Sequence, residues 1–280
     1  PDGTIPLVSI RTMTFNHEEY IVDCLEGALM QKTTFPVQYL IHDDASTDLT
    51  GEILKEYAEK YPNVIRVYSQ SKNTFRSSNK HQLRKAYFDL INGKYIALCE
   101  GDDFWIDPLK LQKQVDYLEA HPETSISFHG VNIVDKFGKT LRTVRDYFQC
   151  LKLEDVIKEP INYCSVVHRN LYDRKVFSNP ISVPNGDRLF FALLAKFGNA
   201  VNPGFIGACY RKTSAGYHSQ QQLEQNAKSK IKTMRLMGLS GEFREQKKAI
   251  DRRIFLLKKG AIFRSMLQLK FGVTWRIFKY

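Results

Sequence analysis

Short apolar runs alternate with longer amphipathic segments along the first hundred residues of the chain. The apolar runs have the length of buried strands and lie near residues 7–12, 37–42, 64–68 and 95–99. Segments with apolar residues at helical spacing lie near residues 19–31, 49–61 and 79–91. Because strands that alternate with helices are typical of a sheet flanked by helices, this rhythm predicts an α/β fold with one continuous sheet.

The second half of the chain has a more mixed pattern. A polar turn over residues 135–138 separates the strand-like segments 126–134 and 139–145, which predicts a hairpin. Residues 161–168 are strand-like, and residues 188–198 form an apolar segment that stops at a glycine, as a helix does. Five apolar residues near the end recur at helical spacing and predict a further helix. They are Phe255, Ile262, Met266, Leu269 and Val273.

Two of the expected strands end in paired carboxylates. Asp43 and Asp44 follow the second strand, and Asp102 and Asp103 follow Gly101 after the fourth. In an open α/β sheet, ligands bind at the carboxyl ends of the strands, so we expect both pairs to face one pocket. Carboxylate oxygens hold Mg²⁺ or Mn²⁺, and a diphosphate is the expected ligand of that metal. Asp43 or Asp44 suits a nucleobase or a ribose.

Helix capping is the alternative explanation for several polar residues near these pairs. Asp107 precedes Pro108 at an expected helix start, and residues 46–48 precede the expected helix 49–61. We interpret Asp107 and residues 46–48 as caps. Capping does not explain the two carboxylate pairs, for which a functional role is favoured.

With these motifs in this order, the chain resembles the inverting glycosyltransferases of family 2, which have the GT-A fold and use nucleotide-diphosphate sugars. The matching motifs are residues 8–16, 41–50 and 100–114, and the resemblance covers most of the first 218 residues. It implies a GT-A-like, Rossmann-related mixed sheet flanked by helices, with a C-terminal helical extension. The implied segments are a nucleotide-sugar-binding half (1–104), an acceptor-binding and catalytic half (105–218) and a basic helical extension (219–280).

The resemblance also implies roles for single residues. The implied donor contacts are Thr12, Asn16, Asp43, Asp44, Arg76, Asn79, Asp102, Arg211 and Lys212. Asp102 and Asp103 are the implied ligands of Mn²⁺ or Mg²⁺. The family often has a metal-binding His where this chain has Thr213, and His218 is the candidate replacement; a solvated loop histidine is the alternative. In the loop that ends at Asn79, Thr74 and Ser78 depart from the family pattern.

Asp187 is the candidate catalytic base. It precedes the apolar segment 188–198, where a lone Asp is commonly an N-cap. Its position resembles that of the carboxylate that activates the acceptor in the family, although Gly186 replaces the preceding Glu of the family pattern. A cap and a base are not exclusive roles.

The reaction implied by the resemblance is transfer of a hexosyl or N-acetylhexosaminyl group from a nucleotide-diphosphate donor, with a UDP-sugar expected. The implied acceptor is a hydroxyl of a glycan, a glycolipid or a surface polysaccharide, and inversion is expected. A sugar nucleotidyltransferase is the alternative enzyme. That class would carry a glycine-rich basic loop after the first strand, and residues 13–19 do not form one.

Positive charge is concentrated at the end of the chain. The formal net charge is +11, and the last 29 residues hold eight basic side chains and no acidic one. This composition suits docking on an anionic membrane, and the alternative is a helix that packs its apolar stripe on the catalytic core. A basic nucleic-acid-binding module is disfavoured because acids line the strand ends. The sequence does not indicate an oligomeric state.

The cysteines and the lengths of the apolar runs bear on the compartment. The five cysteines are scattered and lack Cys-x-x-Cys spacing, which favours a reducing compartment. No signal peptide opens the sequence, and the longest purely apolar run, residues 189–195, is shorter than the roughly 20 residues of a membrane span. We expect a cytoplasmic protein, peripheral on the inner face of the membrane.

Overall fold

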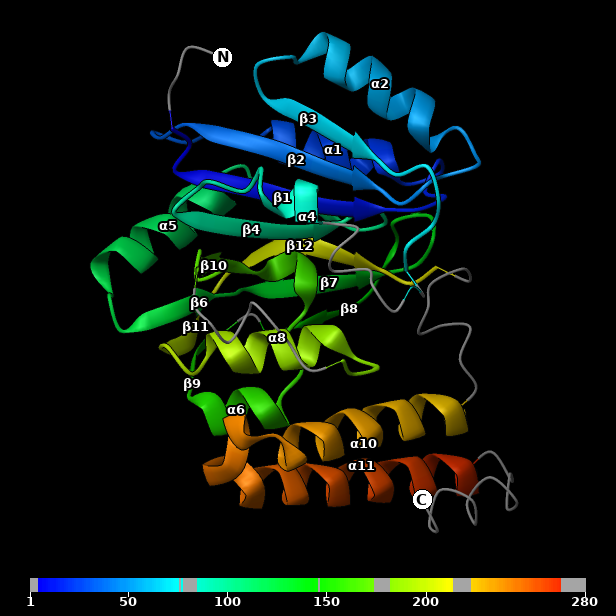
Figure 1. The fold of residues 1–280 in the computed structure, drawn as a ribbon, viewed down its shortest axis with the longest axis vertical. Helices are drawn as coiled ribbons and strands as arrows, with labels where there is room; N and C mark the ends of the chain where they lie inside the picture. The colour runs from blue at the N-terminus through cyan, green and yellow to red at the C-terminus, as the bar shows by residue number, and fades with distance from the viewer. Residues whose placement is uncertain are drawn as a thin grey trace. The chain divides into compact units, whose positions relative to one another are not determined.

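The chain divides into two compact units, which we name the sheet unit and the helical unit. A computed structural model describes residues 5–75, 77, 85–145, 147–173, 182–213 and 223–267 (Figure 1). The sheet unit comprises the chain up to residue 150 with residues 162–170 and 201–211. The helical unit comprises residues 151–161, 171–200 and the chain from residue 212 onward. This division describes which parts of the chain pack together. The expected segments 1–104, 105–218 and 219–280 describe functional roles, and they stay a prediction.

The sheet unit is built on an eight-stranded mixed sheet of order β3-β2-β1-β4-β10-β6-β11-β9. Its strands are β1 (Val8–Thr14), β2 (Val37–Asp43), β3 (Ile65–Ser69), β4 (Tyr95–Glu100), β6 (Thr124–Ser127), β9 (Phe148–Leu151), β10 (Val167–Arg169) and β11 (Asn199–Pro203). Strands β1 to β4 run parallel, and β10 is antiparallel to β4 and β6. The helices are α1 (Ile21–Leu29), α2 (Thr50–Lys60), α4 (Lys85–Phe88) and α5 (Lys110–Ala120). The first four expected strands and the helices at 19–31 and 49–61 are thereby confirmed.

The expectation of one continuous sheet is wrong, because a second sheet of order β5-β12-β7-β8 is present. Its strands are β5 (Phe104–Trp105), β7 (Gly130–Val134), β8 (Thr140–Val144) and β12 (Ile206–Arg211). The expected strand 126–134 changes sheets in its middle. The amide of Phe128 donates to Val201 in the first sheet, whereas that of Gly130 donates to Phe205, next to β12. The predicted hairpin is confirmed, since β7 and β8 pair antiparallel.

The core of the sheet unit explains why its parallel strands have continuous apolar sequences. Residues 39–41 of β2 and 95–99 of β4 are buried along their whole length, as expected for strands covered on both faces. Against them pack Leu25 of α1 and Leu54 of α2. The register of β2 and β4 with β1 fixes where their carboxyl ends lie.

The helical unit is formed by α6 (Leu153–Lys158), α8 (Gly186–Leu194), α10 (Leu223–Leu239), the short 3₁₀ segment η2 (Gly241–Gln246) and α11 (Lys247–Leu267). Helices α10 and α11 pack side by side as a hairpin (Figure 1). Their shared core includes Leu193, Met234, Phe243 and Ile250. The expected helix 188–198 is confirmed, although it ends at Leu194. In the expected strand 161–168, only the end is a strand, because residues 163–165 form a 3₁₀ turn before β10.

The C-terminal helix is confirmed as far as residue 267, but its apolar stripe does not form one buried face. Ile262 packs inward beside Ala261, whereas 63% of Phe255 is exposed. Leu269 and Val273 lie outside the described residues. Within the described ranges, no helix is both long and apolar enough to cross a membrane.

Lys110, the first residue of α5, is completely buried. Its Nζ lies 3.8 Å from the centre of the Trp105 ring and has no hydrogen-bond partner within the described part of the chain. Burial lowers the pKa of Lys110 from its ordinary value to about 7, and the nearby thiols of Cys99 and Cys164 act in the opposite direction. The fold therefore favours the neutral amine at this position.

We expect Lys110→Met to reduce the pH dependence of stability above neutrality. Between pH 7 and the unfolded pKa of about 10.4, the unfolded chain binds more protons at this position than the folded chain, so wild-type stability rises with pH. Below pH 7, Lys110 is protonated in both the folded and the unfolded chain, and the free-energy cost of burying its charge is fully present. Between pH 7 and 9 the wild type should gain roughly 2 kcal/mol relative to Lys110→Met. Urea unfolding at several pH values measures this difference.

The control is Lys113→Met, one turn along the same helix, because 44% of the Lys113 side chain is exposed. Its stability should follow the wild-type pH curve. A Lys110→Met curve parallel to that of the wild type would show that Lys110 remains charged in the fold.

Candidate active site

The carboxyl ends of three neighbouring parallel strands form one edge of the large sheet. Strand β1 lies between β2 and β4, and the register pairs Thr14 with Asp43 and Met13 with Glu100. The pairing continues past the strands, since the amide of Asp44 donates to the Thr14 carbonyl at 3.0 Å and that of Gly101 to the Met13 carbonyl at 3.0 Å. The two acidic pairs therefore leave the sheet at the same edge, on either side of the loop after β1.

Asp43 and Asp44 are held by the loops that surround them. Oδ1 of Asp43 accepts hydrogen bonds from the Ser46 amide at 3.2 Å and from the Ser46 hydroxyl at 2.5 Å. Oδ1 of Asp44 accepts from the amide and the hydroxyl of Thr74, at 2.9 and 2.6 Å. Each residue is only 4% exposed. Both carboxylates are fixed in position, and their predicted contacts with the donor stay a prediction.

The loop after β1 is tied to the loop after β2. The Asn16 amide donates to the Ser46 hydroxyl at 3.0 Å, and Asn16 Oδ1 accepts from the Thr47 amide at 2.8 Å. Asp48 accepts from the Thr50 amide at 3.0 Å at the start of α2. The N-cap position of α2 is Leu49, without a side-chain cap hydrogen bond, so the interpretation of residues 46–48 as caps is wrong. The bonds of Asn16 instead connect the two loops. They also give exposed Asn16, at φ 53°, a structural role in addition to its predicted contact with the donor.

Glycine is required at position 101 by close packing. A Cβ there would lie 2.6 Å from the Thr14 hydroxyl oxygen and 2.8 Å from His17 Nδ1, closer than real Cβ contacts. Thr14 and His17 themselves contact each other at 3.1 Å. The turn that carries Asp102 is therefore pressed against the loop after β1.

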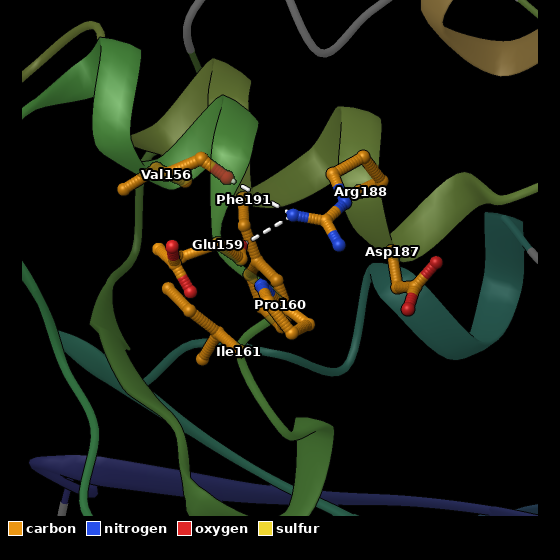
Figure 2. Close-up of a pocket in the computed structure, with 7 residues that line it drawn as sticks. All are labelled: Val156, Glu159, Pro160, Ile161, Asp187, Arg188 and Phe191. Carbon is orange, nitrogen blue, oxygen red and sulfur yellow. Dashed lines mark hydrogen bonds between the residues drawn. The ribbon is translucent and has the colours of Figure 1, made fainter. Parts of the chain in front are cut away.

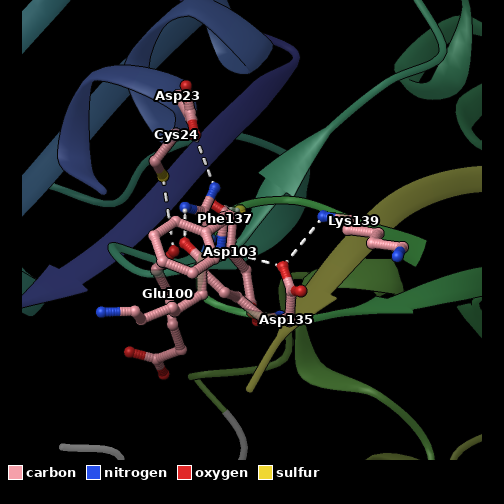
Figure 3. Close-up of polar contacts among 10 residues, drawn as sticks. Asp23, Cys24, Glu100, Asp103, Asp135, Phe137 and Lys139 are labelled. Atoms are coloured by element: carbon pink, nitrogen blue, oxygen red, sulfur yellow. Dashed lines mark hydrogen bonds and ion pairs between the residues drawn. The ribbon is translucent and has the colours of Figure 1, made fainter. Parts of the chain in front are cut away.

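Asp102 and Asp103 are adjacent in sequence but have different surroundings. Asp103 is 1% exposed, and its Oδ1 accepts the Arg211 amide of β12 at 2.8 Å (Figure 3). Burial, and then the neighbouring charge of Asp102, raises the pKa of Asp103 well above its usual range. Asp102 is only half-buried. Asp103 thus anchors the turn to β12, and Asp102 is the carboxylate at the surface.

His17 is a site residue that the sequence reasoning did not identify. Burial lowers its pKa, and the negative charges of Asp102, Asp48 and Asp43 act in the opposite direction. His17 therefore lies within the electrostatic reach of carboxylates from both acidic loops. The only sequence signal was its position three residues after the end of the first strand.

The residues at this edge fit a site for a divalent cation whose coordination is completed by oxygens of a bound ligand. In the described part of the chain, no group of three or more His, Cys, Asp or Glu side chains is placed to hold a metal. Mg²⁺ is commonly bound through one or two carboxylates plus phosphate oxygens, so a three-residue cage is not required. Asp102 at the surface, backed by Asp103, supplies hard oxygen donors beside a second carboxylate pair. His218, the candidate third ligand, lies outside the described residues.

Two predicted donor contacts have other partners in the structure. Thr12 is completely buried, and its hydroxyl is 3.1 Å from the Tyr39 hydroxyl, so a direct donor contact from Thr12 does not fit. The Arg211 guanidinium binds Asp23 at 2.5 Å, and Asp23 is labelled in Figure 3. The guanidinium is also 4.9 Å from the centre of the Phe104 ring. Its predicted phosphate contact therefore competes with an ion pair. Lys212 is exposed, and Arg76 and Asn79 lie outside the described residues.

Asp187 lies in the first turn of α8 in the helical unit. The N-cap position is Asn185, whose side chain accepts a hydrogen bond from Thr233 at 3.3 Å, so the reading of Asp187 as the N-cap is wrong. Asp187 is exposed beside a small hollow in the surface of the helical unit. The hollow is lined by Val156, Glu159, Pro160, Ile161, Asp187, Arg188 and Phe191 (Figure 2).

Arg188 holds one wall of this hollow in place. Its guanidinium donates to the backbone carbonyls of Val156, at 3.2 Å, and Glu159 (Figure 2). These bonds tie the start of α8 to the end of α6. The Asp187 carboxylate is thus carried by a braced helix start, next to a recess with apolar and acidic walls.

Comparison with known proteins identifies relatives of the chain. Residues 9–179 match the family model described as glycosyl transferase family 2. An uncharacterized protein of Mycobacterium tuberculosis is 46% identical over 131 residues, which are 47% of this chain and 37% of that protein. The putative teichuronic acid biosynthesis glycosyltransferase TuaG of Bacillus subtilis is 28% identical over 180 residues, 64% of this chain and 67% of that protein. The chain thus spans well under half of the mycobacterial relative.

Solved structures share the fold at low sequence identity. Staphylococcus aureus TarS 1–349 in complex with UDP-GlcNAc aligns with a TM-score of 0.63 at 16% identity, covering 88% of this chain and 71% of that chain. The mannosyltransferase PcManGT of Pyrobaculum calidifontis, in complex with GDP-Man and Mn²⁺, aligns with a TM-score of 0.62 at 17% identity, covering 95% and 76%. The expected GT-A-like mixed α/β fold is confirmed.

Proposed function

Because the chain belongs to glycosyl transferase family 2, we propose that it transfers a sugar from a nucleotide-diphosphate donor, a UDP-sugar, to a hydroxyl of a glycan, glycolipid or surface polysaccharide. The observation that carries this proposal is the meeting of two carboxylate pairs at one edge of the sheet. Asp43 and Asp44 leave β2 there, and Asp102 leaves β4, with the end of β1 between them. The structural neighbours bind UDP-GlcNAc and GDP-Man, which supports a nucleotide-sugar donor.

Each carboxylate has its own part in the proposed reaction. In this proposal the buried, loop-fixed carboxylates of Asp43 and Asp44 accept hydrogen bonds from the nucleoside. Asp102 would hold the metal ion, and Asp103 anchors the turn that carries it. Bound Mn²⁺ or Mg²⁺ would neutralise charge on the diphosphate leaving group. The Mn²⁺ in PcManGT supports this requirement for a metal.

Asp187 is the proposed general base. Its carboxylate takes the proton of the acceptor hydroxyl as that oxygen attacks the anomeric carbon. Attack from the face opposite the diphosphate inverts the configuration at that carbon. An exposed carboxylate on a braced helix start, beside a recess, supports this assignment.

We also place the reaction in the reducing cytoplasm, at the inner face of the membrane. All five cysteines are free, and Cys24, Cys99, Cys164 and Cys209 are buried among core residues without pairing. A chain that folds with unpaired core thiols suits a reducing compartment.

The donor assignment is tested with a panel of nucleotide-diphosphate sugars, with and without Mn²⁺. A ligand that binds only the folded state raises its stability by about 2.7 kcal/mol at 100 times its Kd. We expect one UDP-sugar to raise the melting temperature in the presence of Mn²⁺ and to be hydrolysed slowly without an acceptor. Release of pyrophosphate from a nucleoside triphosphate and a sugar phosphate would instead indicate a nucleotidyltransferase.

A further inference from the structure

Helix α11 has two faces of different chemistry. The inner face carries Ile250, Ile254, Leu257 and Ala261, which recur every three or four residues and pack within the helical unit. On the opposite side lie Lys248, Arg252, Phe255, Leu256, Lys259 and Phe263, all exposed. We name these six residues the outer face.

The outer face exposes more apolar surface than a solvated helix requires. Phe255 is 63% exposed, Phe263 62% and Leu256 43%, all within about two turns. The side of a surface helix that faces solvent normally carries charged and polar residues, and clustered exposed apolar side chains mark an interaction site. Since the inner face already packs on the helical unit, the outer face is available to a partner.

The charge of the outer face indicates what that partner is. Lys259 lies between Leu256 and Phe263, and Lys248 and Arg252 precede Phe255 on the same face. Asp251 is the single acid among residues 247–267 of this helix. The sequence beyond the described residues adds Lys270, Arg276 and Lys279, and no acid. Phenyl rings interleaved with basic side chains suit a helix that lies in the headgroup region of an anionic bilayer.

We propose that the outer face of α11 docks this protein on an anionic lipid bilayer. Phe255, Leu256 and Phe263 enter the boundary between headgroups and acyl chains, while the basic side chains bind lipid phosphates. A second copy of the chain is a poorer occupant, because twofold pairing of this face would set like charges against each other. A nucleic acid would satisfy the charges but not the apolar side chains. The docking rests on the proposed location of the protein at the membrane, whereas its test does not depend on sugar transfer.

The proposal is tested by sedimentation with vesicles of phosphatidylcholine containing 30% phosphatidylglycerol, and with pure phosphatidylcholine vesicles. Wild type should partition onto the anionic vesicles, and Phe255→Ser/Phe263→Ser should weaken this partitioning at least about tenfold. Removing each basic side chain should cost about fivefold, so Lys248→Glu/Arg252→Glu/Lys259→Glu should lose nearly all binding.

Matched controls are available in the sheet unit. Phe137→Ser removes an aromatic side chain of a residue that is 83% exposed, and Lys55→Glu reverses a charge whose side chain is 79% exposed. Both controls should bind anionic vesicles like the wild type. Melting temperatures of all variants should stay near the wild-type value, because the substituted side chains are exposed.

Three outcomes would overturn the proposal. The first is equal binding to neutral and anionic vesicles. The second is unchanged vesicle binding by both outer-face variants. The third is a wild type that does not bind vesicles but self-associates, or binds duplex DNA, and loses that property in the outer-face variants. Donor stabilisation by a nucleotide sugar should be unaffected in every variant, so this test is separate from that of the transferase function.

Discussion

Replacing Asp102 with Asn should abolish metal-dependent binding of the nucleotide-sugar donor and lower transfer by about 10²-fold or more. Asp102 is the surface carboxylate of the turn after β4, and an amide oxygen is a much weaker ligand for a hard cation. The melting temperature without ligand should change little, because Asp102 is only half-buried. The change is measured as donor affinity in Mn²⁺ and in EDTA, together with the transfer rate.

Substitution of Asp103 should instead lower the stability of the protein, because Asp103 is buried and anchors the turn after β4. Its buried Oδ1 accepts the Arg211 amide, so Asp103→Ala leaves that donor unsatisfied and should destabilise the protein by about 1–3 kcal/mol. Asp103→Asn keeps an oxygen acceptor and should retain more stability. Asp116→Asn, on the exposed side of α5, is the charge-matched control and should leave Mn²⁺ dependence intact. Undiminished Mn²⁺-dependent affinity in Asp102→Asn would remove this residue from the metal site.

The strand ends and the acidic edge could be predicted from sequence because the signals are local. Strands β2 and β4 are covered on both faces, so their apolar runs stop where the chain leaves the sheet, and the carboxylates after those stops are immediately visible. Parallel order then brings Asp43 and Glu100 to the same edge as Thr14. Two apolar runs, each followed by carboxylates, and one general property of parallel sheets were sufficient.

The remaining features depend on partners that are distant in sequence. Arg211 has a side chain that commonly binds phosphate, but here its guanidinium is bound by Asp23, which is 188 residues away in the sequence. Thr12 is buried, and its hydroxyl contacts Tyr39 and Cys24, which lie on other elements. The sequence of the strand that contains Thr12 does not indicate either neighbour. The change of sheet between Phe128 and Gly130 likewise follows from hydrogen bonds to residues 201 and 205. A single sequence does not reveal such pairings.

Asp187→Asn should lower the rate of sugar transfer by about 10² to 10⁴ while leaving donor affinity unchanged. An amide does not accept the proton of the acceptor hydroxyl, and the proposed donor contacts are made by other residues. Stability should fall by no more than about 1 kcal/mol, the typical contribution of an acid near a helix N-terminus. The N-cap position is Asn185, whose side chain makes no capping hydrogen bond, so the substitution removes no cap.

Glu159→Gln is the matched control for Asp187→Asn, because Glu159 is exposed and lines the same hollow. If loss of any negative charge near the recess slows transfer, both variants should be impaired alike; if Asp187 is the base, only Asp187→Asn should fall by orders of magnitude. Transfer rate, donor affinity and melting temperature are measured on the same preparations. A loss that appears in turnover with no matching change in donor affinity is the signature of a group that acts in the transition state. Transfer by Asp187→Asn at nearly the wild-type rate would show that this carboxylate is not the base.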